Sequence, residues 1–254
     1  MSKVRNSKWR WGRFSVVFVV VLLLGVVAAS SPAAAFWWWW DDPEPEAPGD
    51  EPVLLVHGFA DSSDSIWWDV LENNLEDAGY EDDDIYRLDL GALLTTVDSP
   101  KEYAKEVCNK LEAIRLNEGL SEVDVIAHSM GGLDSRWCIE EMGGAVHVDD
   151  LVTLGTPHQG TTAAYLGYFT EGGRAMVPGS SFLTTLNRDG VAQGVEYTAV
   201  YGTWDEAVNP DENAKIPSSV LGDVEGRNIK AGPYTHLSLI WHEEVFNDYK
   251  HHLD

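Results

Sequence analysis

The chain has 254 residues and a formal net charge of −25, with 42 acidic side chains against 17 Lys and Arg. Such an acid excess disfavours nucleic-acid binding, and the two cysteines, Cys108 and Cys138, lack the spacing of a zinc site. The length therefore predicts one enzyme-sized domain with an N-terminal extension, and we expect no required cofactor and no metal.

The first 35 residues have the pattern of a secretory signal peptide. Residues 1–13 hold five basic side chains and no acid, residues 14–29 are apolar apart from Ser15, and residues 33–35 offer a small-residue cleavage site. We predict cleavage there and a secreted protein. The alternative is an uncleaved membrane anchor facing outside, because the apolar stretch continues through the tryptophans at 37–40, and tryptophan suits a membrane interface.

Residues 36–50 combine this tryptophan cluster with a linker rich in proline and acid, which cannot bury a core. The catalytic domain is therefore expected at 51–254. Without residues 1–35 the chain keeps 12 Lys and Arg against 42 acids, a net charge of −30. We interpret this excess as a halophilic adaptation, in which salt screens the repulsion, rather than as the surface of an ordinary acidic secreted enzyme.

Strand and helix patterns alternate along the first part of the domain. This alternation predicts an α/β fold with a mostly parallel, doubly wound sheet. The glycine-rich stretch 161–194 is either a short mobile flap or an ordered helix and loop, and it is too short for a large cap domain. The predicted strands are 53–56, 85–90, 123–127 and 151–154, and the predicted helices are 65–78, 100–117 and 130–142.

Ser129 is the candidate nucleophile. It lies in the pentapeptide AHSMG at 127–131, directly between a predicted strand and a predicted helix. A serine on such a turn is lifted above the sheet, where a base can take its proton. Ala127 replaces the first glycine of the usual G-x-S-x-G string, a departure of one methyl group.

Two backbone N–H groups are predicted to form the oxyanion hole, those of Phe59 and Met130. Phe59 follows the first strand in the string HGF at 57–59, and Met130 follows the serine. Because backbone groups do this work, the two side chains are free to line an apolar acyl pocket. Core packing is the alternative for each of them.

Three strings resemble those of small secreted microbial lipases of the α/β-hydrolase superfamily, the class-2 or AHSMG-type lipases. They are VLLVHGF at 53–59, VDVIAHSMGGLDSR at 123–136 and LVTLGTPHQGT at 151–161. The resemblance covers about residues 51 to 250. It implies hydrolysis of esters of acyl lipids, at a lipid or membrane interface or in solution.

His236 is the candidate base, since the Ser, acid, His order of these enzymes requires a histidine late in the chain. It follows the predicted last strand, 227–231, and precedes an expected amphipathic closing helix at 237–249. On that helix His242 is expected at the surface, and His251 and His252 in a solvated tail. Four histidines are excluded because they adjoin the oxyanion loop or the serine, or precede the acid: His57, His128, His147 and His158.

Asp205 is the candidate acid, because it is the first carboxylate after the alternating strand pattern 195–201. It is expected to orient the His236 ring and to stabilise its charged form. Glu206, Asp211 and Glu212 compete for this role. The family resemblance points to the same pair, Asp205 and His236.

Cys108 and Cys138 each lie about eight residues into a predicted helix, and the two helices flank the strand that ends at Ser129. At about 1.5 Å rise per residue the two thiols reach a similar depth. An exported protein meets an oxidising environment, so we expect an intramolecular disulfide. Two buried free thiols are the alternative.

These features lead to an exported serine carboxylic ester hydrolase, a triacylglycerol lipase or carboxylesterase. An acyltransferase or thioesterase on the same machinery is the first alternative, because the acceptor is not decided by the triad. A catalytically silent surface-binding protein that docks through the tryptophans at 37–40 is the second.

Overall fold

The computed structural model describes residues 51–222 and 226–253. The predicted signal peptide, 1–35, and the tryptophan cluster and linker, 36–50, lie outside the described residues. Within the described ranges, no helix has both the length and the apolar character needed to cross a membrane.

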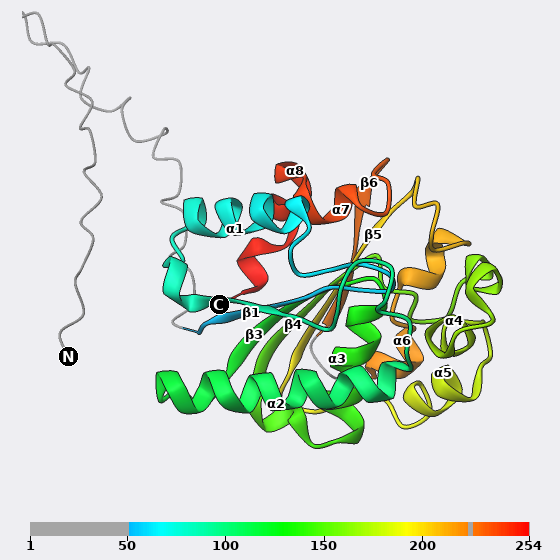
Figure 1. Ribbon diagram of the computed structural model, residues 1–254, viewed down its shortest axis with the longest axis horizontal. Helices are drawn as coiled ribbons and strands as arrows, with labels where there is room; N and C mark the ends of the chain where they lie inside the picture. The colour runs from blue at the N-terminus through cyan, green and yellow to red at the C-terminus, as the bar shows by residue number, and fades with distance from the viewer. Residues whose placement is uncertain (1–50, 223–225, 254) are drawn as a thin grey trace, which may run out of the picture. The chain divides into compact units, whose positions relative to one another are not determined.

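Six parallel strands form one sheet in the order β2-β1-β3-β4-β5-β6 (Figure 1). The order reverses direction between β1 and β3, as in a doubly wound sheet, and this confirms the predicted fold class. All carboxyl ends of the strands lie at one edge, so the loops that follow them share that edge. The strands are β1 (Val53–Val56), β2 (Ile85–Leu88), β3 (Val123–His128), β4 (Val148–Leu154), β5 (Glu196–Gly202) and β6 (Gly226–Gly232).

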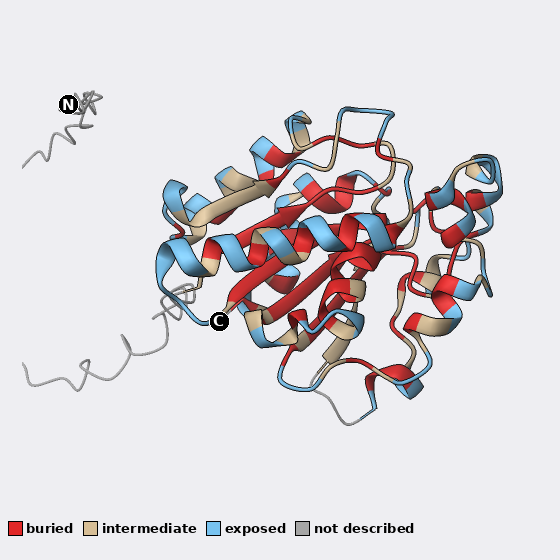
Figure 2. Cartoon of the chain, turned by 60° about the horizontal axis from the view of Figure 1, so that its bottom comes forward, coloured by how far each residue is buried: buried red, intermediate tan, exposed pale blue. Residues whose placement is uncertain are grey.

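Helices cover both faces of the sheet, with α2 (Pro100–Glu118) and α3 (Met130–Glu141) on one side. The other side carries α1 (Ile66–Ala78), α7 (Ser238–Trp241) and α8 (Glu243–Tyr249) (Figure 1). The four central strands, β1, β3, β4 and β5, are buried almost throughout, whereas the edge strands β2 and β6 are mostly half-buried (Figure 2). Burial on both faces explains why the central strands read as continuous apolar runs.

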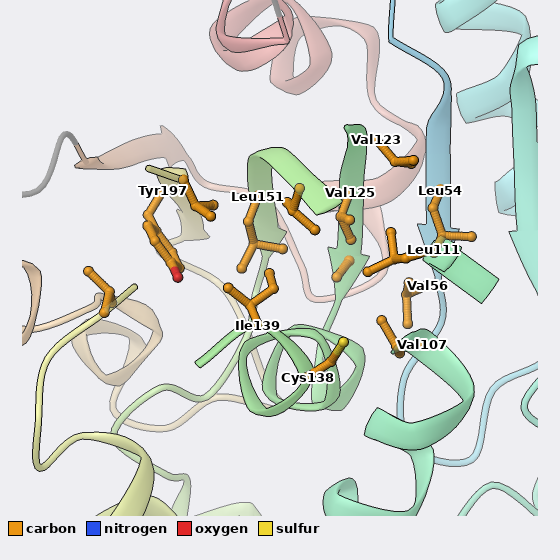
Figure 3. Packing of buried hydrophobic residues seen from close by; sticks show 14 of the residues in the cluster. Leu54, Val56, Val107, Leu111, Val123, Val125, Cys138, Ile139, Leu151 and Tyr197 are labelled. Atoms are coloured by element: carbon orange, nitrogen blue, oxygen red, sulfur yellow. The ribbon is translucent and has the colours of Figure 1, made fainter. Parts of the chain in front are cut away.

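Alternate residues of each strand enter two separate cores. Leu54 and Val125 pack with Val107 and Leu111 of α2 on one face (Figure 3). Leu55, on the opposite face, belongs to the second core together with side chains of α1 and α8. The sheet is thus clamped from both sides, which holds the loops at its carboxyl edge in fixed relative positions.

Local signals place the ends of the long helices. Ser99 caps α2 by accepting a hydrogen bond from the Lys101 N–H, and Pro100 occupies its first turn. Gly119 ends the helix in the left-handed conformation at φ 75°. The predicted helix 100–117 begins at the observed residue and ends one residue before the observed end, Glu118.

Three predicted elements differ from the structure by more than one residue at an end or by an internal break. The strand expected at 85–90 ends at Leu88, and the strand expected at 151–154 begins three residues earlier, at Val148. That extension contains two acidic residues, 149 and 150, which conceal a buried strand in a hydropathy pattern. The single closing helix at 237–249 is wrong: His242 adopts an extended conformation, at φ −84° and ψ 121°, and divides it into α7 and α8.

The stretch 161–194 is an ordered set of short helices, the second of the two predicted alternatives. It contains η3 (Thr162–Gly167), α4 (Glu171–Ala175) and α5 (Ser181–Leu186). Phe182 and Leu183 of α5 pack with Leu133 of α3, so the segment rests on the nucleophile helix. The expectation of no large cap domain is confirmed.

Cys108 of α2 and Cys138 of α3 form a disulfide, with a Cα separation of 5.6 Å. This confirms the predicted bridge over the alternative of two free thiols. Cys138 is fully buried and adjoins the same core as Val107 and Ile139 (Figure 3). The bridge joins α3, the helix that begins directly after Ser129, to its neighbour α2.

The remaining elements are short. They are η1 (Asp82–Asp84), η2 (Gly144–His147), η4 (Asp211–Ala214), α6 (Ser218–Leu221) and η5 (Lys250–His252).

Candidate active site

Ser129 occupies a strained turn between β3 and α3. Its backbone angles, φ 56° and ψ −128°, are rarely adopted by residues other than glycine. A side chain at Gly131 would place a Cβ 2.5 Å from the backbone oxygen of His57, and one at Gly132 would collide with Thr156. Glycine at both positions allows α3 to pack closely against the strand ends, and the turn lifts Ser129 clear of the sheet.

The structure brings the three predicted triad residues together. His236 Nε2 lies 2.9 Å from Ser129 Oγ, and His236 Nδ1 lies 2.9 Å from Asp205 Oδ2. The other oxygen of Asp205, Oδ1, accepts hydrogen bonds from the N–H groups of Ala207, at 2.9 Å, and Val208, at 2.8 Å. Both carboxylate oxygens are therefore held, and the acid can orient the Nδ1–H of His236 so that Nε2 is free to accept the serine proton.

The carboxylate beside His236 Nδ1 is that of Asp205 and not that of a competing residue. Glu206 is exposed and accepts a hydrogen bond from the backbone N–H of His236, at 3.3 Å, rather than from its ring. Glu212 pairs with Lys215. His242 is half-buried, not a surface residue as predicted, because its ring lies 4.6 Å from that of Tyr234 between the two closing helices.

One of the two tail histidines also differs from the expectation. His252 is half-buried beside Arg227 and Glu196, whereas His251 is exposed as predicted. Neither residue belongs to the site.

The expected oxyanion donors flank the serine. A Cβ at Gly58 would lie 2.7 Å from Ser129 Cβ and 3.0 Å from Met130 N, so the glycine lets the β1 loop approach the turn. Among the loop and turn hydrogen bonds of the described residues, neither the Phe59 N–H nor the Met130 N–H is a donor, which leaves both available to an oxyanion.

The side chains of these two residues take different roles. The Phe59 ring lines the cavity above the serine. The Met130 side chain is fully buried and packs with Tyr103 and Leu133, so core packing is correct for Met130.

Two residues not singled out from the sequence hold the β1 loop in place. Asp61 is buried and accepts hydrogen bonds from Ser65 Oγ, at 2.7 Å, and Trp67 Nε1, at 3.2 Å. His57 Nε2 accepts the Leu90 N–H at 3.1 Å, and burial lowers the pKa of the His57 ring, so it stays neutral. The sequence around both residues gave no sign of these contacts, because their partners lie in other parts of the fold or depend on the shape of the loop.

His128 and Gly155 are further site residues that the sequence did not indicate. His128 is fully buried, its Nε2 lies 3.1 Å from the backbone oxygen of His236, and the two rings are 4.4 Å apart. Burial, and next the neighbouring His236, lower the pKa of His128 well below the usual range. Gly155 has φ 58°, and a Cβ there would lie 3.0 Å from Asp205 Oδ2 and 3.1 Å from His236 Nδ1.

The serine opens into a cavity of about 540 Å³. Its wall is almost entirely apolar: Ser129, His236, Thr161 and Thr170 are the polar side chains among the lining residues. The other lining residues come from the loops after β1, β2 and β4, from η3, α4 and the residues beside them, and from the acid loop. No cluster of His, Cys, Asp and Glu within the described ranges has the arrangement of a metal site. The geometry thus suits acyl transfer through a serine, with an apolar group held beside it.

Comparisons with known proteins agree with this geometry. Residues 30–168 match the family described as "Domain of unknown function (DUF7379)". A triacylglycerol lipase of Pseudarthrobacter phenanthrenivorans is 27% identical over 117 residues, covering 44% of this chain and 35% of the lipase. A lysosomal thioesterase PPT2-B of Xenopus laevis is 33% identical over 110 residues, covering 43% of this chain and 37% of the thioesterase. The chain thus spans about a third of the length of these curated relatives.

Solved structures show the same fold. The mature lipase BlEst2 of Bacillus licheniformis superposes with a TM-score of 0.66 at 21% identity, over 84% of this chain and 94% of that one. Lipase B of Aspergillus fumigatus superposes with a TM-score of 0.60 at 22% identity, over 75% of this chain and 49% of that one. The chain has the α/β-hydrolase fold, as its resemblance implied.

Proposed function

The chain belongs to the DUF7379 family, and we propose that this member is an exported serine hydrolase of carboxylic esters, a lipase of acylglycerols. The observation that carries the proposal is the hydrogen-bonded series Asp205, His236, Ser129 at the floor of an apolar cavity. A site that pairs an activated serine with an apolar chain-binding space fits an acyl ester.

The proposed reaction has two halves. Ser129 Oγ attacks the ester carbonyl carbon while its proton passes to His236 Nε2, and the N–H groups of Phe59 and Met130 hold the developing oxyanion. Collapse of this intermediate breaks the bond to the alcohol, which leaves with the proton from His236. Water then attacks the acyl-enzyme, with His236 again accepting the proton, and the fatty acid departs as Ser129 recovers its hydrogen.

Asp205 serves this cycle by orientation and charge. Its Oδ2 receives the Nδ1–H of His236, and the positive ring formed during each half-reaction is stabilised beside the carboxylate. The two backbone donors on Oδ1 keep the carboxylate from rotating away.

A thioesterase is the second candidate, favoured by the 33% identity to a lysosomal thioesterase over part of the chain. The same triad attacks a thioester carbonyl, and a thiol replaces the alcohol as leaving group. A silent surface-binding protein is the third, and the assembled triad argues against it. We also propose that the protein is exported, which the N-terminal pattern supports. The AHSMG motif supports its assignment to the class-2 lipases, and the acid excess supports adaptation to salt.

A fluorophosphonate probe tests the proposed function. We expect purified protein to be labelled and Ser129→Ala to be unlabelled. Absence of labelling, or labelling that survives Ser129→Ala, would overturn the enzyme proposal. A series of p-nitrophenyl esters from acetate to palmitate then ranks chain lengths, and matched acyl thioesters separate a thioesterase from a lipase.

A further inference from the structure

Large apolar side chains stand exposed at the mouth of the cavity. They come from two segments, the loop after β2 and the turn formed by η3 and the residues after it. Leu94 is 74% exposed, Leu166 85% and Phe169 84%. We call this set the apolar collar: Leu93, Leu94, Tyr165, Leu166, Tyr168 and Phe169.

The collar is continuous with the cavity wall, because Leu94, Leu166 and Phe169 also line the cavity. An apolar path therefore runs from solvent to Ser129. Exposed apolar groups of this size in a single patch mark an interaction surface rather than ordinary surface variation.

A backbone hydrogen bond and a ring contact hold the collar in this exposed position. Leu94 has φ 68°, a strained conformation for leucine, and its N–H donates to the Ala60 oxygen at 3.0 Å. On the other side the Tyr165 and Tyr168 rings stack at 6.1 Å. The structure keeps these side chains outside the core instead of folding them into it.

The loops that surround the collar are strongly acidic. The loops at the carboxyl edge, 57–65, 89–99, 155–180, 203–217 and 233–237, hold nine Asp and Glu against two basic residues, Arg174 and Lys215. Lys215 pairs with Glu212, and Arg174 donates to the Tyr168 oxygen at 3.3 Å. Arg174 therefore remains the one cation of these loops without a carboxylate partner in the described chain, and a single cation among nine acids is no basic patch that could attract an anionic lipid headgroup.

We propose that the collar docks the protein on uncharged lipid surfaces, and that the acidic loops exclude it from anionic ones until salt screens the repulsion. The proposal rests on the ester-hydrolase function only in treating the cavity as an acyl-chain site. Insertion of apolar side chains into an interface needs no headgroup charge. Seven of the nine loop carboxylates are exposed or half-buried, since Asp61 and Asp205 are buried, and these seven repel an anionic surface over about a Debye length. The occupant is therefore a neutral or zwitterionic lipid layer.

Co-sedimentation with vesicles tests the docking in the full chain carrying Ser129→Ala, so that no lipid is consumed. The collar variant adds Leu93→Ser, Leu166→Ser and Phe169→Ser. The matched control adds Leu116→Ser, Met142→Ser and Val146→Ser, three apolar residues exposed near the opposite edge of the sheet. Thermal midpoints check that both variants stay folded. Any contribution from residues 36–50 is common to the three proteins and cancels in the comparison.

On phosphatidylcholine vesicles we expect the collar variant to partition at least about tenfold more weakly than the parent, and the control to equal the parent. With phosphatidylglycerol vesicles we expect weak binding by the parent at about 0.1 M KCl and binding near the phosphatidylcholine level at about 2 M, in salt-matched vesicles. Equal binding by the collar variant and the control, or stronger binding to phosphatidylglycerol at low salt, would overturn the proposal.

Two measurements separate this outcome from failure of the proposed function. Docking with no fluorophosphonate labelling of the Ser129 protein would refute the hydrolase and keep the surface. Labelling without collar-dependent docking would refute the docking surface and keep the hydrolase. Sedimentation equilibrium identifies the competing occupant, since a dimer that the collar variant abolishes would mean that the collar binds a second copy.

Discussion

His128 donates a hydrogen bond from Nε2 to the backbone oxygen of His236, 3.1 Å away. The residue before the nucleophile thus holds the loop that carries the base. Its ring is fully buried 4.4 Å from the His236 ring, and its Nδ1 has no partner within the described chain. A neutral imidazole fits this position, because burial lowers its pKa well below the usual range.

We therefore predict that His128→Leu lowers kcat/KM for p-nitrophenyl butyrate by about 10- to 100-fold, because a small displacement of the base misaligns the proton transfer. His128→Gln, whose amide N–H can reach the same oxygen, should recover much of this loss. The pH dependence of kcat/KM separates positioning from general damage. If the leucine variant matches the parent, or if the glutamine variant is no better than leucine, His128 does not position the base.

Single alanine substitutions at Ser129, His236 and Asp205 should each lower kcat by several orders of magnitude. Ser129→Ala combined with His236→Ala should cost little more than either alone, because the triad acts as one unit. Independent, additive losses would contradict the assignment. His242→Ala is the control, since its ring contacts Tyr234 and Trp241 and lies outside the triad, and it should retain most of the activity.

The centre of the sheet could be predicted from sequence because its four central strands are buried on both faces. Four consecutive apolar residues between breakers located Val53–Val56 without error. The same signal failed at the start of β4, where Asp149 and Asp150 interrupt it although Asp150 is 2% exposed. A different signal, amphipathic helical spacing, failed at His242. The break between α7 and α8 preserves that spacing, so the sequence pattern reads as one helix.

The three triad residues could be predicted because each follows a strand at the same edge of a parallel sheet. His57, His128 and Gly155 could not, because their roles depend on contacts between loops that are far apart in the chain. Gly155, for example, matters because a Cβ there would meet both Asp205 and His236. Sequence spacing carries no information on such an approach.

Asp134 provides a test of buried charge. It is fully buried in α3, neither carboxylate oxygen has a hydrogen-bond partner among the described residues, and burial raises its pKa well above the ordinary 3.8. The folded state thus holds the proton more tightly than the unfolded chain. As the pH rises above the ordinary pKa of 3.8, the unfolded chain releases this proton first, and Asp134 lowers the stability of the folded state. We predict that Asp134→Asn raises the thermal midpoint at pH 7 by at least about 2 °C.

The gain from Asp134→Asn should vanish below about pH 3, where the carboxyl group of the parent is protonated in both the folded and the unfolded state. Asp77→Asn, at an exposed site, controls for the loss of one negative charge. Differential scanning calorimetry at both pH values provides the comparison. A gain that is equal at both values, or equal to that of the Asp77 variant, would refute the explanation by buried charge.

Reduction of the disulfide Cys108–Cys138 should destabilise the protein. The bridge spans a sequence separation of 30, for which the loop-entropy relation gives about 3 to 4 kcal/mol. For a domain of this size the thermal midpoint should fall by about 6 to 16 °C on adding reductant. Cys108→Ser with Cys138→Ser should show the same fall and no further response to reductant. Intact mass after alkylation without reductant checks the bridge, and two alkylated thiols would mean that it is absent.

The acidic surface should make stability depend on salt. The run Glu81 to Asp84 is largely exposed. The pKa of Asp84 is raised first by partial burial and then by the neighbouring carboxylates of Glu118, Glu81 and Asp83, as expected for mutual repulsion. We predict that the thermal midpoint rises between about 0.1 M and 3 M KCl, because the screening length shrinks severalfold over this range. Glu81→Gln with Asp83→Asn should raise the midpoint at low salt more than at high salt, since it removes repulsion that salt otherwise screens. A flat midpoint for the parent, or an equal gain for the variant at both salt concentrations, would show that the acid excess is not an adaptation to salt.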